Sequence, residues 1–150
     1  MKRRIGVYAG SFNPFHIGHK DILDQARPLF DQIIIAIGDN PEKSNLNREP
    51  FPISIGDSKV AVSYYHGLLS DKLSSLDLND DNVEVFLIRG LRNGEDLQYE
   101  QNQIQFIRDM YPSLRVVFFI CNRNVEHVSS SALRALRKIS PIDYKKYTFE

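Results

Sequence analysis

The sequence is poor in cysteine, with Cys121 as the single one among 150 residues. One cysteine excludes an internal disulfide, and this sparing use is typical of proteins from a reducing compartment. A surplus of charge is also missing, because 19 Lys and Arg balance 19 Asp and Glu. Proteins that bind duplex DNA usually carry a basic surplus, so we expect no nucleic acid partner.

Long hydrophobic runs are missing as well. The longest, at residues 33–37 and 116–121, have the length of a strand and are far too short to span a bilayer. Residues 2–4 are basic, but the apolar stretch after them is too short for a signal peptide. We therefore expect a cytoplasmic protein with no membrane partner. A length of 150 residues with 42% hydrophobic content predicts one globular domain over residues 1–150.

Strand and helix signals alternate along the chain. Runs rich in Val and Ile predict strands at residues 5–9, 33–37, 60–65, 83–88 and 116–121. Helical spacing of apolar residues predicts helices at residues 20–30, 67–76, 95–110 and 130–139. We expect a long loop at residues 39–58 and no clear element after residue 141. Several strands are apolar throughout, which predicts an α/β fold: a Rossmann-like doubly wound sheet of about five parallel strands with flanking helices.

The most informative segment is the turn GSFNPFHIGH at residues 10–19, between the first strand and the first helix. Free backbone N–H groups and the helix dipole favour phosphate at such a turn. His16 and His19 lie three residues apart, on roughly one face of the helix start, and can act together on one anion. The pair also admits interpretation as zinc ligands or as helix caps without chemistry. Only four histidines and one cysteine are present, which argues against zinc.

Polar segments follow most of the expected strands. The carboxyl ends of strands in an open α/β sheet meet at one edge, where ligands bind. The charges expected at this edge are mostly positive: His16, His19, Lys43, Arg89, Arg92 and Arg123. Three serines at residues 129–131 open a helix and add a second anion site at its start. Two helix starts and several cations suit a triphosphate, and predict phosphoryl or nucleotidyl transfer by charge stabilisation.

Two motifs make the chain similar to a known family. Residues 10–19 resemble the GSFDPFHxGH signature of nucleotidyltransferases with the T/HxGH motif. The run IRGLR at residues 88–92, followed by Asp96, Tyr99 and Glu100, resembles the phosphopantetheine adenylyltransferase family more specifically. Residues 40–43, 67–69 and 129–131 also match that family in order and position, so the resemblance covers roughly residues 4–139.

The resemblance implies adenylyl transfer from ATP to 4′-phosphopantetheine, giving dephospho-coenzyme A and pyrophosphate, with Mg²⁺ accompanying ATP. It implies catalytic roles, with His19 at the α-phosphate, for Ser11, His16, His19 and Lys43. It implies ATP contacts at Gly10, Ser11, His19, Gly90, Arg92, Glu100, Ser129, Ser130 and Ser131. It implies acceptor contacts at Ser11, Lys43, Leu68, Leu69 and Arg89. A homo-oligomer, in this family a hexamer, is implied as well.

The sequence departs from the family pattern mainly on the acceptor side. Asn13 replaces the usual Asp, residues 44–59 are shortened and rich in proline, and the usual C-terminal helix is missing. Gln103 and Ile107 stand where the family has an apolar residue and an Asn facing the acceptor. Two alternatives therefore stay open. One is the same reaction with another phosphomonoester, such as nicotinamide mononucleotide, and the other is a non-catalytic nucleotide-binding module.

Overall fold

The computed structural model describes residues 1–38, 50–78 and 80–149. Its strands form one sheet in the order β3-β2-β1-β4-β5, with every neighbouring pair parallel. The strands are β1 (Arg3–Gly10), β2 (Gln32–Gly38), β3 (Val60–Tyr65), β4 (Val83–Leu91) and β5 (Val116–Ile120). The α-helices are α1 (Ile17–Ala26), α2 (Leu69–Leu78), α3 (Gly94–Met110), α4 (Ser130–Ile139) and α5 (Pro141–Tyr144). The predicted fold class is confirmed.

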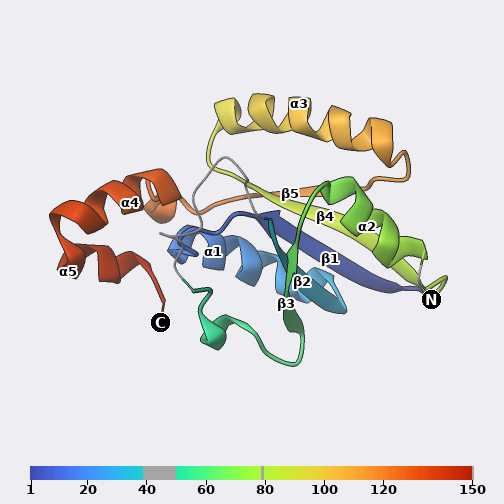
Figure 1. Ribbon diagram of the computed structural model, residues 1–150, viewed down its shortest axis with the longest axis horizontal. Coiled ribbons are helices and arrows are strands. Elements are labelled where there is room, and N and C mark those ends of the chain that lie inside the picture. The colour runs from blue at the N-terminus through green and yellow to red at the C-terminus, as the bar shows by residue number, and fades with distance from the viewer. Residues whose placement is uncertain (39–49, 79, 150) are drawn as a thin grey trace.

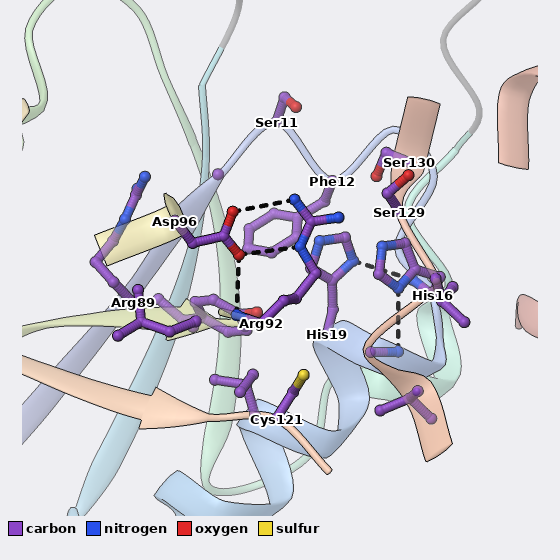
Figure 2. Close-up of a pocket in the computed structure, with 18 of the residues that line it drawn as sticks. Ser11, Phe12, His16, His19, Arg89, Arg92, Asp96, Cys121, Ser129 and Ser130 are labelled. Atoms are coloured by element: carbon purple, nitrogen blue, oxygen red, sulfur yellow. Dashed lines mark hydrogen bonds and ion pairs between the residues drawn. The ribbon is translucent and has the colours of Figure 1, made fainter. Parts of the chain in front are cut away.

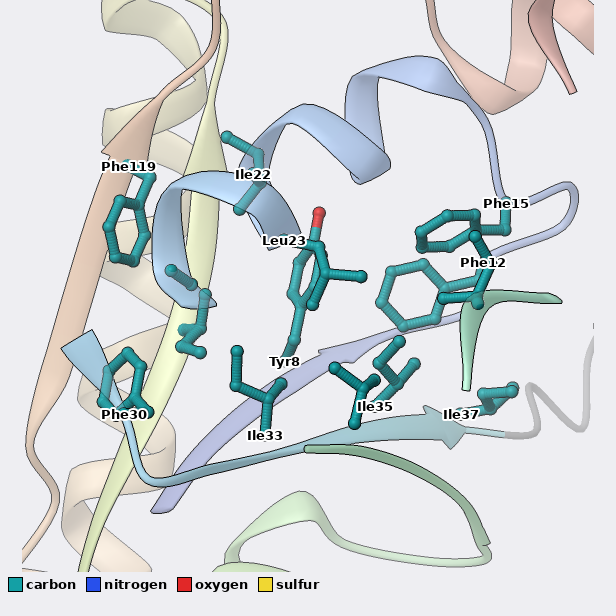
Figure 3. Packing of buried hydrophobic residues seen from close by; sticks show 14 of the residues in the cluster. Tyr8, Phe12, Phe15, Ile22, Leu23, Phe30, Ile33, Ile35, Ile37 and Phe119 are labelled. Atoms are coloured by element: carbon teal, nitrogen blue, oxygen red, sulfur yellow. The ribbon is translucent and has the colours of Figure 1, made fainter. Parts of the chain in front are cut away.

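Helices cover both faces of the sheet, and α4 and α5 lie beyond its carboxyl end (Figure 1). On one face, Ile22 and Leu23 of α1 pack in a cluster with Tyr8 of β1 (Figure 3). On the other face, α2 and α3 contribute Leu73 and Ile104 to a second cluster with side chains of β1 and β4. Because side chains alternate along a strand, neighbouring residues at a strand end point to opposite helix layers. Neighbouring residues at the end of β4 therefore contribute to two different sides of the sheet.

Several predicted boundaries are wrong by a few residues. Helix α1 begins at Ile17 rather than residue 20, because the side chain of His16 caps it. Helix α2 begins two residues later than predicted, after Gly67, whose φ of 81° is a conformation that glycine adopts readily. Strand β4 continues to Leu91, so Arg89 and Gly90 lie within the strand rather than after it. Within the expected loop at residues 39–58, a 3₁₀ helix spans Ile53–Ile55, and residues 39–49 lie outside the described ones.

The tail contains helical structure, so the expectation of no clear element there is wrong. After α5 a 3₁₀ helix spans Lys145–Tyr147, and the buried Tyr144 packs with Val128 and Leu133. The chain then returns to the first turn, where Thr148 forms an isolated antiparallel β-bridge with His16. Long-range aromatic packing of this kind leaves no periodic signal in a sequence.

Among the helices of the described residues, none combines the length and the apolar character that a membrane span requires.

Candidate active site

A cavity of about 390 Å³ opens at the carboxyl ends of β1 and β4 (Figure 2). These two strands are neighbours at the centre of the sheet, and they lead to helices on opposite faces. Doubly wound sheets bind ligands in the crevice at this kind of reversal. The predicted site residues that line the cavity are Gly10, Ser11, His16, His19, Arg89, Gly90, Arg92, Glu100, Ser129, Ser130 and Ser131.

Other predicted site residues lie elsewhere. Leu68 is 51% exposed and Leu69 packs against the apolar cluster under α2, and neither lines the cavity. Arg123 is exposed in a 3₁₀ helix after β5 and does not line it either. Lys43 lies outside the described residues.

The two histidines form a capping box at the start of α1. The backbone N–H of Gly18 donates to Nδ1 of His16 at 3.0 Å, and that of His16 donates to Nδ1 of His19 at 3.1 Å. Each Nδ1 is therefore an acceptor, which places the proton of the neutral ring on Nε2. The rings stack with their centroids 3.7 Å apart, so they present two N–H donors side by side (Figure 2). The structure confirms that the two histidines cap the helix, which was one interpretation of the pair from the sequence. This cap uses only Nδ1, so Nε2 of each ring stays available for a ligand.

Both rings are held in the neutral state. Burial lowers the pKa of His16 to about 4, and the charge of Arg92 acts in the same direction. Burial also lowers the pKa of His19 well below its usual value, with further effects from His16 and Arg92. The expectation that these histidines add positive charge is thus wrong near neutral pH, because the desolvated rings do not take up a second proton. They act instead as fixed N–H donors, a form of the ring suited to charge that develops on an oxygen.

An aromatic frame surrounds His19. The ring of Phe15 stacks on it at 5.3 Å, and the ring of Phe12 meets it edge-on at 4.9 Å. Phe12 has a φ of 46°, a left-handed conformation that is costly for a bulky residue. Its ring is buried against Tyr8 and Phe51, and this packing offsets the backbone cost. The first turn is therefore held by packing on several sides.

The start of α4 is fixed against this turn. Ser129 caps the helix by accepting the N–H of Ala132 at 3.1 Å. The hydroxyl of Ser130 donates to the carbonyl of Pro14 at 3.1 Å, and Arg134 Nη1 donates to the carbonyl of Asn13 at 2.7 Å. The contact with Asn13 leaves Arg134 half-buried. Two helix N-termini, each favourable to an anion, thus face one cavity.

Two arginines at the end of β4 are each paired with a carboxylate of α3. Arg92 donates from Nε and Nη2 to Asp96 at 3.0 and 3.2 Å (Figure 2). Arg89 donates from Nε and Nη2 to the two oxygens of Glu100, both at 2.8 Å. Asp96 lines the cavity but is not among the site residues predicted from the sequence, where it stands only as a member of the family motif.

The end of β4 separates the cavity into two sides. Arg89 lies on the face covered by α3, where Glu100 meets it. Gly90 lies on the face covered by α1, so close that a Cβ on it would be 2.8 Å from Ile22. The histidines, Gly90 and the serines at residues 129–131 thus belong to the side of α1 and α4. Arg89 belongs to the side of α2 and α3.

A sequence model of the cytidylyltransferase-like family matches residues 7–136. The fold and the site are therefore those of a nucleotidyltransferase. The phosphopantetheine adenylyltransferase of Cytophaga hutchinsonii is 34% identical over 141 residues, 90% of each chain. That of Christiangramia forsetii is 36% identical over 137 residues, 85% of this chain and 84% of the relative. The chain therefore belongs to the phosphopantetheine adenylyltransferase family.

Solved structures share the fold at lower identity. Nicotinic acid mononucleotide adenylyltransferase of Plasmodium falciparum, complexed with NaAD, superposes with a TM-score of 0.65 at 18% identity, over 97% of this chain and 90% of its own. A bifunctional NMN adenylyltransferase/ADP ribose pyrophosphatase of Francisella tularensis gives 0.68 at 15% identity, over 97% of this chain and 45% of its own. At these identities the likeness concerns the fold alone.

Proposed function

We propose that this chain transfers the adenylyl group of ATP to 4′-phosphopantetheine, giving dephospho-coenzyme A and pyrophosphate in coenzyme A biosynthesis. The observation that carries the proposal is the convergence of two helix starts, two histidine N–H donors and two arginines on one cavity. Such an arrangement stabilises phosphate charge without a covalent nucleophile. Membership of the phosphopantetheine adenylyltransferase family supports the identity of the acceptor.

We infer that each substrate occupies one side of the cavity. The triphosphate of ATP lies on the side of α1 and α4, against Gly10, Ser11, His16, His19, Gly90, Arg92 and the serines at residues 129–131. The acceptor phosphate lies on the side of Arg89, and the resemblance to the family adds acceptor contacts at Leu68, Leu69 and Lys43. An oxygen of that phosphate attacks the α-phosphorus of ATP in line. A bond forms between this oxygen and the α-phosphorus as the bond from the α-phosphorus to pyrophosphate breaks. His19 and His16 donate Nε2–H to the phosphate oxygens on which charge develops, while Ser11 and Lys43 orient the reacting groups.

Mg²⁺ fits this site as a companion of ATP. Among the described residues that line the cavity, the carboxylates are Asp96 and Glu100, and each is paired with an arginine. The described part of the chain also holds no group of three or more His, Cys, Asp or Glu side chains arranged for a metal. We therefore expect phosphate oxygens and water to hold Mg²⁺, a common arrangement for this ion. Bound in this way, it neutralises part of the phosphate charge.

Pyrophosphate release with a panel of acceptors tests the proposal. We expect turnover with ATP and 4′-phosphopantetheine, and little with nicotinamide mononucleotide at the same concentration. Gln103 and Ile107 motivate the alternative of another phosphomonoester as acceptor, because they depart from the family pattern on the acceptor side. Turnover with nicotinamide mononucleotide but not with 4′-phosphopantetheine would show that the proposed acceptor is wrong. ATP binding by calorimetry without any product would favour a non-catalytic module.

We further propose a homo-oligomer, a hexamer by resemblance to the family, and a cytoplasmic location. Phe106 and Met110 on α3 are 67% and 51% exposed, and large exposed apolar side chains often mark an interface. The single cysteine suits a reducing compartment. Sedimentation velocity of the wild type and of Phe106→Ser tests the assembly, which the substitution should weaken.

A further inference from the structure

The β5–α4 connection, residues 121–129, forms one wall of the cavity. It runs from the end of β5 at Ile120 to the start of α4 at Ser130, and a 3₁₀ helix spans Arg123–Val125 within it. Because so short a helix gives the connection little support from within, its position depends on how its two ends are held. The residues that it contributes to the lining of the cavity are Cys121, Val125, Val128 and Ser129.

The end of the connection at α4 is bound to the first turn. Ser130 donates to the carbonyl of Pro14 at 3.1 Å, and Arg134 donates to the carbonyl of Asn13 at 2.7 Å. These contacts place the start of α4 beside the turn that carries His16.

The end of the connection at β5 is bound to α1 through Asp21. Oδ2 of Asp21 accepts the backbone N–H of Asn122 at 2.9 Å, and Oδ1 accepts from the side-chain amide of Asn122. Gln25, one turn later on α1, donates from Nε2 to Oδ2 of Asp21 and to the carbonyl of Ile120, both at 3.0 Å. Two side chains of α1 thus bind the last residue of β5 and the second residue after it.

Asp21 and Gln25 act at a distance from the ligand. Neither is among the described residues that line the cavity, and both are half-buried. Helix α1 presents His19 to the cavity only two residues before Asp21, so one rigid element fixes the histidine and the connection relative to each other. Hydrogen bonds to a carboxylate are roughly twice as strong as those between neutral groups, which suits Asp21 to this task.

We propose that Asp21 is a positioning residue for ATP: with Gln25 it holds the β5–α4 connection against α1, so that Val125 and the serines at residues 129–131 enclose the nucleotide together with His19. The inference rests on the proposed function, because it takes the ligand on the side of α1 and α4 to be ATP. Asp21 acts through Asn122 and contacts no reacting atom.

Calorimetry of ATP and Mg²⁺ with Asp21→Asn tests this role. The amide carries no charge and turns a donor toward an N–H of Asn122, so the connection loses part of its anchor. We expect the Kd for ATP to rise about five- to tenfold, in the range for a weakened charged hydrogen bond, and the KM for ATP to rise with it. The values of kcat and of the KM for 4′-phosphopantetheine should stay within about twofold of the wild type.

Asp24→Asn is the matched control. It removes the same charge from the same helix at an exposed position, where Asp24 pairs with Lys20, and it should leave the Kd for ATP unchanged. An unchanged Kd in Asp21→Asn, or an equal rise in the KM of both substrates, would overturn the proposal. Gln25→Ala removes the contact with the carbonyl of Ile120 and should raise the Kd in the same direction. A folded Gln25→Ala with the affinity of the wild type would contradict the proposal as well.

Hydrogen exchange separates positioning from a general loss of stability. If Asp21 holds the connection, amides of residues 121–129 exchange faster in Asp21→Asn, while those of β1 and β4 keep the rates of the wild type. Faster exchange throughout the sheet would show a merely structural role and would count against the proposal.

Failure of the proposed function would look different. Binding of ATP does not require the acceptor, so a wild type that binds ATP without adenylylating 4′-phosphopantetheine leaves the difference between Asp21→Asn and Asp24→Asn measurable. A wild type that binds no ATP would overturn both proposals.

Discussion

Each of the two site histidines uses one ring nitrogen for the fold and keeps the other for the ligand. Nδ1 of His16 and of His19 accepts a backbone N–H in the capping box, which fixes the tautomer and the plane of each ring. Burial lowers the pKa of both rings, so they stay neutral where the free side chain would begin to protonate. The resulting Nε2–H donors do not have to reorganise when charge develops on a phosphate oxygen.

His19→Ala removes one of these donors, and we expect kcat to fall by about 10²–10³, as for loss of one oxyanion contact. The KM for ATP should change by less than about threefold, because the helix starts and Arg92 still bind the ground state. Initial rates over a range of ATP concentrations check this, with His127→Ala as the control at an exposed histidine that does not line the cavity. A weaker affinity for ATP at an unchanged kcat would show that His19 contributes uniform binding instead.

The lowered pKa of His16 also predicts how stability depends on pH. The unfolded chain protonates this ring below about pH 6.5, whereas the folded ring stays neutral down to about pH 4. The unfolded state therefore binds more protons in this window, and the free energy of unfolding falls as the pH is lowered. The slope is at most about 1.4 kcal/mol per pH unit for one histidine. Asp57, with a pKa of about 2, titrates below this window.

Urea unfolding of the wild type and of His16→Asn between pH 4.5 and 7 measures this contribution. Asparagine is a favoured N-cap, so the variant keeps the cap and loses the titrating group. We expect a shallower decrease in stability on acidification for His16→Asn than for the wild type. Equal slopes would mean that the ring is not buried in a neutral state.

At the scale of elements, α4, α5 and the tail act as a support for the first turn. Ser130 and Arg134 bind carbonyl groups at Pro14 and Asn13, and Thr148 pairs with His16. The ring of Phe149 lies 5.9 Å from that of Phe15, which in turn stacks on His19. The end of the described chain is thus connected to the histidines through one aromatic ring.

Phe149→Ala should lower the free energy of unfolding by about 1–3 kcal/mol, less than full burial of a Phe would give, because Phe149 is only half-buried. Ile142→Ala on α5 is the matched control, since Ile142 is 80% exposed and its truncation should cost less than about 0.5 kcal/mol. Urea midpoints at pH 7.5 compare the two variants. Equal midpoints would contradict a supporting role for the tail.

At the scale of the whole molecule, the sequence predicted the parallel sheet and most of the cavity. Apolar strands such as residues 33–37 carry a local signal, and polar residues at strand ends converge because parallel strands end at one edge. The pairing of Arg89 with Glu100 was not predicted, since it requires α3 to lie against β4 at a particular register. The neutral state of the histidines depends on burial, in which the rings of Phe12 and Phe15 cover His19, and no residue pattern reports burial directly.

The central claim is that this cavity joins AMP from ATP to the phosphate of 4′-phosphopantetheine. The most direct measurement is mass spectrometry of the products formed by the purified wild-type chain from ATP, Mg²⁺ and 4′-phosphopantetheine. The account predicts dephospho-coenzyme A and pyrophosphate in equal amounts, with formation of both reduced about 10²–10³-fold in His19→Ala. Absence of the adenylylated product, or its formation only with another phosphomonoester, would contradict the claim.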